Sequence, residues 1–302
     1  MASLKNIKLK IFSYKKTGTV THAMEAVSAV KMRKAQERAL SGRAYAAAGL
    51  SVLERLSSTV DLKRHPLMQE RSGRTALIVV TSDKGLAGAL NSGVIRLVEN
   101  EISSRRLKKE DIEIIAFGKR GGDYFETREY KTYSFTNTND SISESDVSAI
   151  TDGILLKGTI TQVFVGYQNF ISTFEQHPTF RQIVPIRPEM MRQIVASIRP
   201  ARGRYAPQSF NDESHNALTY TIEPDPDEVL AVLLPKLFSI AVLHALLEAK
   251  ASEHSARMVA MKSATDKAEE MAHNLTRTFN KVRQAAITRE VSEITSGIEA
   301  MR

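Results

Sequence analysis

The chain has 302 residues and a formal net charge of +8, and it contains no cysteine and no tryptophan. Without cysteine it can form no disulfide, thiol nucleophile, iron–sulfur cluster or cysteine-ligated zinc site. Hydrophobic residues at 42% and charged residues at 25% are typical of a folded globular protein. No uninterrupted apolar run reaches the roughly 18 residues of a membrane-spanning helix. The first residues lack the apolar stretch of a secretory signal.

Charge and proline divide the chain into three parts. Residues 1–60 hold 11 Lys or Arg against 3 Asp or Glu, so the excess positive charge lies almost wholly there. All nine prolines lie between Pro66 and Pro235. Because proline breaks helix interiors, the two proline-free ends predict long helices on either side of a globular centre. The predicted divisions are 1–65, 66–224 and 225–302.

The N-terminal part predicts a basic helix with a narrow face of small and apolar side chains. That face recurs every three or four residues: Met32, Ala35, Ala39, Gly42, Ala46, Gly49, Leu53 and Leu56. Its basic residues could bind nucleic acid, anionic lipid or an acidic protein surface. No aromatic residues interleave with the charges and no nucleic-acid motif is present, which favours the acidic protein surface.

The middle part alternates strand-like and helix-like segments. Strands are expected at 75–82, 112–117, 162–167, 181–186 and 217–222, with helices up to about residue 103 and over 145–156. This order predicts an α/β doubly wound domain with a mostly parallel sheet. Residues 200–216 are expected to form a polar loop.

A glycine turn follows the first expected strand, at Gly85 and Gly88. Such turns can bind phosphate at a helix N-terminus. The spacing matches neither common phosphate-loop pattern, so a tight strand-to-helix turn is the preferred interpretation and a nucleotide-dependent enzyme is the alternative.

The C-terminal part predicts one helix that begins with Asp225 as N-cap and Pro226 at the first helical position. Pro235 is expected to bend its first turns. Seventeen uncharged positions alternate at steps of three and four, which predicts a left-handed supercoil paired antiparallel with the N-terminal helix. These positions are Leu230, Leu233, Leu237, Ile240, His244, Leu247, Ala251, His254, Met258, Met261, Thr265, Ala268, Ala272, Leu275, Phe279, Val282 and Ala286.

The seven histidines form no known metal or catalytic pattern. His244 and His254 fall on the uncharged face, where packing or interhelical hydrogen bonding is the expected role. We therefore predict no catalytic residue, no cofactor site and no metal site.

Three sequence stretches resemble the gamma subunit, or central rotor shaft, of F-type ATP synthase. They are residues 21–36 (THAMEAVSAVKMRKAQ), residues 81–91 (TSDKGLAGALN) and a long C-terminal run with SEH at 252–254, ARMVAM at 256–261, ATD at 264–266 and FNKVRQAAITRE at 279–290. The resemblance covers both ends and the middle of the chain.

The resemblance implies an α/β fold with a long antiparallel coiled coil, in which the terminal helices form the shaft and a Rossmann-like domain is inserted at its base. It implies a non-catalytic rotor that turns inside a ring of alpha and beta subunits, with the epsilon subunit and the membrane c-ring as further partners and no nucleic acid. Proton or sodium flow through the c-ring would turn it, at the cytoplasmic face of a bacterial inner membrane.

The resemblance also implies contact residues. Met24 and Arg257 match positions that meet acidic beta loops, and Arg33 and Lys34 are weaker candidates. The upper-shaft positions that bond to the ring match Arg283, Gln284, Thr288 and Glu290. Tyr220 and Glu223 match the foot that meets the c-ring. The simpler alternatives are that Arg257 braces the two helices and that Met24 fills the seam.

The sequence departs from the family pattern at a few positions. His22 stands where lysine is common. Ala87 and Ala89 replace a frequent Cys and Gly. The cysteine-bearing regulatory insert of chloroplast members is absent, which excludes thiol control and favours a bacterial origin.

Overall fold

The computed structural model describes residues 4–57, 65–136, 142, 144–156, 158–197, 223 and 225–301. Two compact units divide the chain. One holds the residues up to Ser28 together with those from Arg257 onward, and the other runs from Ala29 to Ala256. The predicted strand at 217–222 and the predicted polar loop lie outside the described residues.

The larger unit is built on a five-stranded sheet in the order β3-β2-β1-β4-β5. Strands β1 (Arg74–Val80), β2 (Ile112–Phe117), β3 (Lys131–Phe135) and β4 (Ile160–Ser172) are parallel, and β5 (Glu175–Val184) is antiparallel to β4. This confirms the predicted α/β class with a mostly parallel sheet, and β1, β2 and β4 overlap their predicted ranges closely.

Side chains of the central strands alternate between the two faces of the sheet. In β1, Leu77 and Val79 join one apolar cluster, whereas Ile78 and Val80 join the other. The first cluster includes α3 (Leu90–Ser104), α4 (Lys119–Thr127) and part of β2. A short 3-10 helix, η2 (Lys109–Asp111), precedes β2. Both faces of β1 and β2 are buried, as expected for parallel strands covered by helices on each side.

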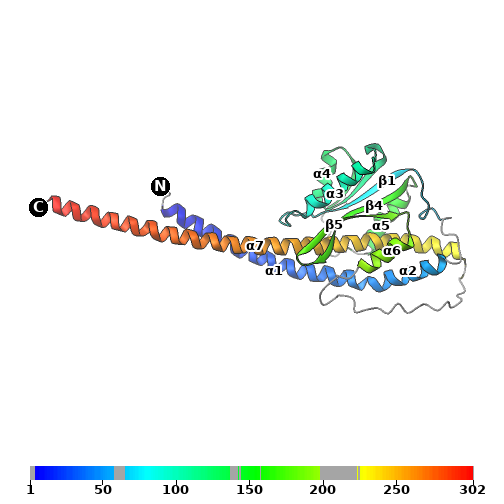
Figure 1. Ribbon diagram of the computed structural model, residues 1–302, viewed down its shortest axis with the longest axis horizontal. Helices are drawn as coiled ribbons and strands as arrows, with labels where there is room; N and C mark the ends of the chain where they lie inside the picture. The colour runs from blue at the N-terminus through cyan, green and yellow to red at the C-terminus, as the bar shows by residue number, and fades with distance from the viewer. Residues whose placement is uncertain are drawn as a thin grey trace. The chain divides into compact units, whose positions relative to one another are not determined.

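The opposite face carries more helices (Figure 1). They are α2 (Arg43–Ser57), α5 (Glu144–Leu156), α6 (Pro188–Ser197) and the first half of α7 (Pro226–Ala300). The hydroxyls of Thr151 in α5 and Ser239 in α7 hydrogen-bond at 2.6 Å. Helix α2 runs antiparallel to α7 (Figure 1), and Gly49 lies against Leu237.

Helix α7 is 75 residues long, begins at Pro226 as predicted, and continues through Pro235. Between Leu237 and Arg257 almost every residue is buried, whichever way its side chain points. The predicted two-stranded seam is therefore wrong for this stretch. A helix that is apolar on all sides belongs in a core or a membrane, and here the sheet and the neighbouring helices surround it.

The same stretch corrects the expectation about membrane spans. An 18-residue window of α7 has a mean hydropathy of 2.1, enough by length and composition to cross a membrane, and 61% of that window is buried inside the protein. Scattered polar residues hide it from a search for uninterrupted apolar runs. Its burial fits a core helix.

Several elements escaped the sequence analysis. Strand β3 is mostly exposed and short, so it lacks the apolar alternation on which strand prediction depends. Helix α4 begins within the glycine cluster after β2, and α6 is a short helix that starts at a proline. The expected single N-terminal helix is two helices, α1 (Leu4–Ser41) and α2, divided at Gly42.

One glycine holds the carboxyl ends of β1 and β2 together. Gly118 has a φ of +96°, and a Cβ atom there would overlap the carbonyl group of Thr81. Its N–H donates to the carbonyl oxygen of Phe135 at 2.9 Å, so Gly118 joins three strands at one edge. Only glycine combines this backbone angle with this close approach.

We expect Gly118→Ala to destabilise the larger unit by about 2 to 3 kcal/mol, because it adds both backbone strain and a steric overlap. The matched control is Gly153→Ala in α5, where a Cβ would meet no atom within 4 Å. That change should be neutral or stabilising by about 0.5–1 kcal/mol, since alanine favours helix. Urea unfolding followed by circular dichroism measures both, and equal effects would contradict the role given to Gly118.

Candidate functional site

The smaller unit is a pair of helical segments, the N-terminal part of α1 and the C-terminal part of α7. Beyond Arg257, the buried positions of α7 are Met261, Thr265, Ala268 and Ala272, at steps of four, three and four. This confirms the predicted seam over that stretch. A 3.5-residue repeat of this kind keeps one narrow face turned toward a partner helix.

Helix α1 carries the complementary face, and the sequence analysis missed it. The least exposed positions follow the same steps: Ile7, Ile11, Tyr14, Gly18, Thr21, Glu25 and Ser28. They continue the predicted N-terminal face backwards from Met32 without a change of register. Extending the three-and-four step toward the N-terminus would have found them, although Gly18, Thr21 and Glu25 are not apolar.

Two contacts set the register of the helix pair. The hydroxyls of Thr21 and Thr265 hydrogen-bond at 2.6 Å. One turn away, a Cβ on Gly18 would lie 3.7 Å from the Cβ of Ala268. Small residues on both sides let the backbones approach closely, so the seam rests on close packing rather than on large side chains.

Beyond the paired region, α7 presents an apolar stripe to solvent. Ile287, Val291, Ile294 and Ile298 are each more than half exposed and recur at steps of four, three and four. Every residue from Ile287 to Met301 is exposed. A stripe of this length that the described chain does not cover marks a surface for a partner protein.

The outer surface of α1 is strongly basic. Lys5, Lys8, Lys10, Lys15 and Lys16 are all exposed, whereas the helix contains only two glutamates. On the same surface, His22 Nδ1 lies 3.5 Å from Glu25 Oε2. Exposed charge of one sign speeds association with surfaces of the other sign, which supports the predicted acidic protein partner.

The chain matches the family model described as ATP synthase over residues 3–301. A gamma chain from Roseiflexus castenholzii is 38% identical over 100% of this chain and 99% of its own length, and one from Geotalea daltonii is 37% identical over 100% of both. This chain belongs to the ATP synthase gamma chain family. The identity extends through both helix ends and the α/β region, so it covers every part of the family's architecture.

Solved structures of distant gamma relatives agree in fold. The rotor of the Euglena gracilis mitochondrial ATP synthase matches 94% of this chain with a TM-score of 0.61 at 16% identity. The central stalk of the Tetrahymena thermophila mitochondrial enzyme matches 81% with a TM-score of 0.57 at 21% identity. At these identities the likeness supports the gamma fold alone.

The predicted contact residues that the structure describes lie on both units. Arg283, Gln284, Thr288 and Glu290 are exposed on α7, and the Thr288 hydroxyl donates to the Gln284 carbonyl at 3.0 Å. Arg33 and Lys34 are exposed on α1, and Glu223 is exposed just before α7. Tyr220 lies outside the described residues. Their roles stay predictions.

Met24 and Arg257 are less accessible than the other predicted residues. Met24 is half-buried on α1, and Arg257 is buried on α7. Counting in opposite directions from the Thr21–Thr265 pair places Met24 level with residue 262, about 7 Å along the axis from Arg257. The helix pair thus brings these two predicted residues near each other. This also suits the simpler alternatives, in which Arg257 braces the two helices and Met24 fills the seam between them.

The glycine turn at residues 85–88 belongs to a network of internal bonds. The Asp83 carboxylate accepts from the backbone N–H of Lys119 at 3.0 Å, at the start of α4. The backbone N–H of Ser82 donates to Asn91 Oδ1 at 2.9 Å, and the Thr81 hydroxyl accepts from the N–H of Gly121 at 2.8 Å. These bonds tie the residues before the turn to α3 and α4, so they favour the interpretation of a tight strand-to-helix turn over a phosphate site.

His65 and His177 bond to nearby residues. His65 Nδ1 accepts from the N–H of Leu67 at 3.2 Å, and partial burial lowers the pKa of His65. His177 contacts Glu175 at 3.0 Å, and His244 and His254 are buried on α7. Across the described ranges, no three His, Cys, Asp or Glu side chains gather as metal ligands would.

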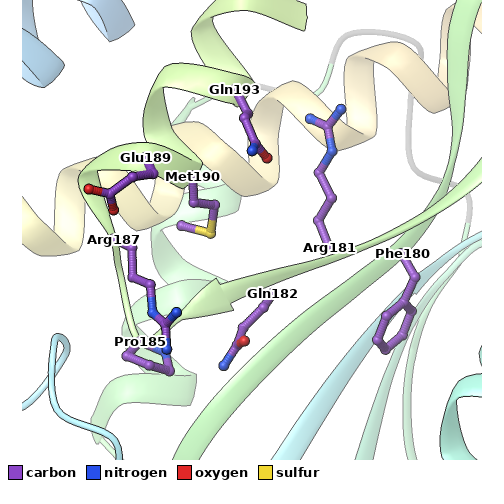
Figure 2. Close-up of a pocket in the computed structure, with 8 residues that line it drawn as sticks. All are labelled: Phe180, Arg181, Gln182, Pro185, Arg187, Glu189, Met190 and Gln193. Carbon is purple, nitrogen blue, oxygen red and sulfur yellow. The ribbon is translucent and has the colours of Figure 1, made fainter. Parts of the chain in front are cut away.

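A hollow of about 520 Å³ lies between β5, at the edge of the sheet, and α6 (Figure 2). Figure 2 shows Gln193 and Met190 on α6 and Arg181 and Gln182 on β5. Arg187 at its mouth is paired with Glu70. The lining residues are Phe180, Arg181, Gln182, Pro185, Arg187, Glu189, Met190 and Gln193. None of them was singled out from the sequence.

The helix register can be tested with engineered thiols, since the chain has no native cysteine. We expect Thr21→Cys combined with Thr265→Cys to form an intrachain disulfide on mild oxidation, because the replaced hydroxyl oxygens lie 2.6 Å apart. The control pairs Thr21→Cys with Asp266→Cys, whose side chain is exposed on the next position of α7. Non-reducing electrophoresis separates the outcomes, and equal cross-linking of both pairs would overturn the register.

Proposed function

We propose that this chain is the central-stalk rotor of an F-type ATP synthase, coupling rotation of a membrane c-ring to ATP synthesis or hydrolysis in a ring of alpha and beta subunits. Membership of the gamma family carries the proposal. Its partners are then the alpha and beta subunits, the epsilon subunit and the c-ring. Its place is peripheral to a membrane complex, at the cytoplasmic face of a bacterial inner membrane.

The long helix supports a mechanical role. One uninterrupted helix of 75 residues passes from the larger unit into the helix pair. Residues 237–257 of this helix are buried on almost every side, so a torque applied to the α/β unit acts on the helix through many contacts at once. Beyond residue 280 the same helix exposes an apolar stripe and the predicted ring contacts.

The chain itself is proposed to be non-catalytic. Thr81, Ser82 and Asp83, which precede the glycine turn, bond to Gly121, Asn91 and Lys119, and these internal bonds favour a structural turn over the alternative of a nucleotide-dependent enzyme. Asymmetric contacts by a turning helix can bias partner subunits between conformations without any chemistry on the helix. The second alternative, a basic coiled-coil nucleic-acid binder, predicts steeply salt-dependent DNA affinity that survives in the assembled complex.

The contact residues form part of the proposal. Arg283, Gln284, Thr288 and Glu290 would bond to the surrounding ring, and Met24 and Arg257, with Arg33 and Lys34, would lie near its acidic loops. Tyr220 and Glu223 would meet the c-ring. The exposure of the upper-shaft residues of α7 and of Glu223 supports their assignments, whereas Arg257 is buried.

Co-purification tests the proposed assembly. A tagged full-length chain should bring down alpha and beta subunits in a fixed ratio from its native cells, because the proposed stalk is a stoichiometric part of the complex. A chain that is recovered alone, or with nucleic acid in place of these subunits, would overturn the proposal.

Substitution tests the proposed upper contacts. We expect Arg283→Ala or Gln284→Ala to lower coupled ATP turnover roughly fivefold while leaving assembly intact, since each loses a hydrogen bond of about 1 kcal/mol to the ring. The matched control is Arg277→Ala, also exposed on α7 and outside the proposed set. Turnover that equals the control would remove these two residues from the site.

A further inference from the structure

A polar cluster is buried where α7 packs on the sheet. Tyr167 comes from β4, Arg181 from β5, and His244 and Glu248 from α7. Tyr167 is 1% exposed, and His244 and Glu248 are each 5% exposed. The fold therefore places a phenol, a carboxyl group and an imidazole together in a core that is otherwise apolar.

The contacts within the cluster are close but incomplete. The Tyr167 hydroxyl hydrogen-bonds to Glu248, and His244 Nε2 lies 3.3 Å from Glu248 Oε1, one turn along α7. Among the described residues, Glu248 Oε2 and His244 Nε2 make no hydrogen bond. Buried polar atoms without partners raise the free energy of the folded state. In such a low-dielectric environment, a change of charge on one of these groups alters that free energy strongly.

Titratable side chains from three elements influence or contact Glu248. β4 contributes Tyr167, β5 contributes Arg181, and α7 itself contributes His244. The Arg181 guanidinium lies 5.7 Å from the centre of the Tyr167 ring, and the same side chain forms a wall of the hollow in Figure 2. Arg181 thus acts on the buried carboxyl group through its charge and also lines the hollow.

Burial decides the protonation of both α7 groups. It raises the pKa of Glu248 to about 8, against the opposing influence of Arg181 and the Tyr167 hydrogen bond. Burial and the Arg181 charge together lower the pKa of His244 to about 3. The 3.3 Å contact is therefore not an ion pair at neutral pH, because desolvation outweighs the attraction that two charges would gain.

We propose that Tyr167, Arg181, His244 and Glu248 form a proton-dependent latch that holds α7 against β4 and β5, closed while Glu248 keeps its proton and loosened when the proton leaves. In the closed state the carboxyl and imidazole groups are neutral. On release the proton passes to water, and the remaining buried carboxylate is stabilised only by drawing Arg181 or water toward it. Either movement disturbs the packing of α7 on the sheet.

Neighbouring contacts extend the latch along α7. The Ser252 hydroxyl donates to the Gln168 carbonyl at 3.0 Å, and the Ser255 hydroxyl donates to the Thr173 carbonyl at 2.6 Å. The latch therefore lies in a row of polar contacts between α7 and the β4–β5 hairpin. Any effect of the latch on the stiffness of a turning stalk rests on the proposed function, whereas the latch itself does not.

The sign of the pH dependence follows from both groups. The raised pKa of Glu248 contributes stability that is full below 4.5 and is lost as the pH rises through about 8. The lowered pKa of His244 contributes stability that is full above 6.5 and is lost as the pH falls through about 3. The two slopes oppose each other between 4.5 and 6.5, so the loss on the alkaline side belongs to Glu248.

Infrared spectroscopy of the full-length chain tests where the proton lies. The absorption of a protonated carboxyl group should persist at neutral pH and disappear with a midpoint near pH 8. It should be missing at neutral pH from Glu248→Gln and present in Glu270→Gln, whose glutamate is exposed and paired with Lys267 on the same helix. A wild-type midpoint near 4.5, or an unchanged signal in Glu248→Gln, would overturn the proposal.

Two further variants keep the test decisive if Glu248→Gln does not fold. Tyr167→Phe removes a hydrogen bond that lowers the pKa of Glu248, and Arg181→Gln removes a positive charge that also lowers it. Both should move the infrared midpoint to higher pH. Midpoints that do not move would show that Tyr167 and Arg181 do not influence the pKa of Glu248, and would contradict the latch.

Amide hydrogen exchange tests the loosening itself. After correction for intrinsic rates, protection of residues 244–252 in the wild type should fall by up to tenfold per pH unit between about 6.5 and the Glu248 midpoint near 8, and level off above that midpoint. In Glu248→Gln the protection should stay level over the same range. If the infrared signal of the wild type titrates but its amide protection stays level, Glu248 carries a buried proton that does not control the packing of α7, and the latch is contradicted. Because both measurements use the chain alone, their failure leaves the co-purification result untouched, and the reverse also holds.

Discussion

Burial of residues 237–257 of α7 on almost every side is the constraint on which the larger unit depends. Residues 237–257 contact the sheet on one side and α2 and its neighbours on the other, and one apolar cluster joins them all. Removing this helix would expose the α7-facing side of β1 and β4 together with the apolar face of α2. The helix therefore forms the core of the α/β unit and is also one of the two helices of the helix pair.

The two halves of α7 meet different demands with the same 3.5-residue pattern. In the core, large side chains such as Leu237 and Phe238 fill space on every face. In the helix pair, Thr265, Ala268 and Ala272 form one narrow seam against Gly18 and Thr21. The end of the helix has an apolar stripe without a partner in the described chain. This progression from full burial to one-sided contact to exposure suits a helix that is fixed at one part and works on other proteins at another.

Polar groups inside the structure serve two different ends. At the carboxyl edge of the sheet, Asp83, Ser82 and Asn91 bond to neighbouring backbone and side chains, which makes a rigid turn from a motif that resembles a ligand loop. Between α7 and the hairpin, Glu248 and His244 are buried with unfilled hydrogen-bonding capacity. The first arrangement fixes the geometry of the sheet edge, and the second leaves a proton-sensitive contact beside the most deeply buried helix.

The sequence alone determined the fold class, the presence of long helices at both ends of the chain, and the family. Patterns of apolar residues, the spacing of prolines and long motifs are local properties of a sequence. They predicted β1, β2, β4, the start of α7 and the seam over 261–272. Tertiary structure decided the rest. Strand β3 is exposed and held by its neighbour β2, and the wrapping of residues 237–257 on every side depends on which elements surround them. Tyr167, Arg181 and Glu248 lie far apart in the chain, so only folding could place them together and raise the pKa of a carboxyl group that the sequence presents as ordinary.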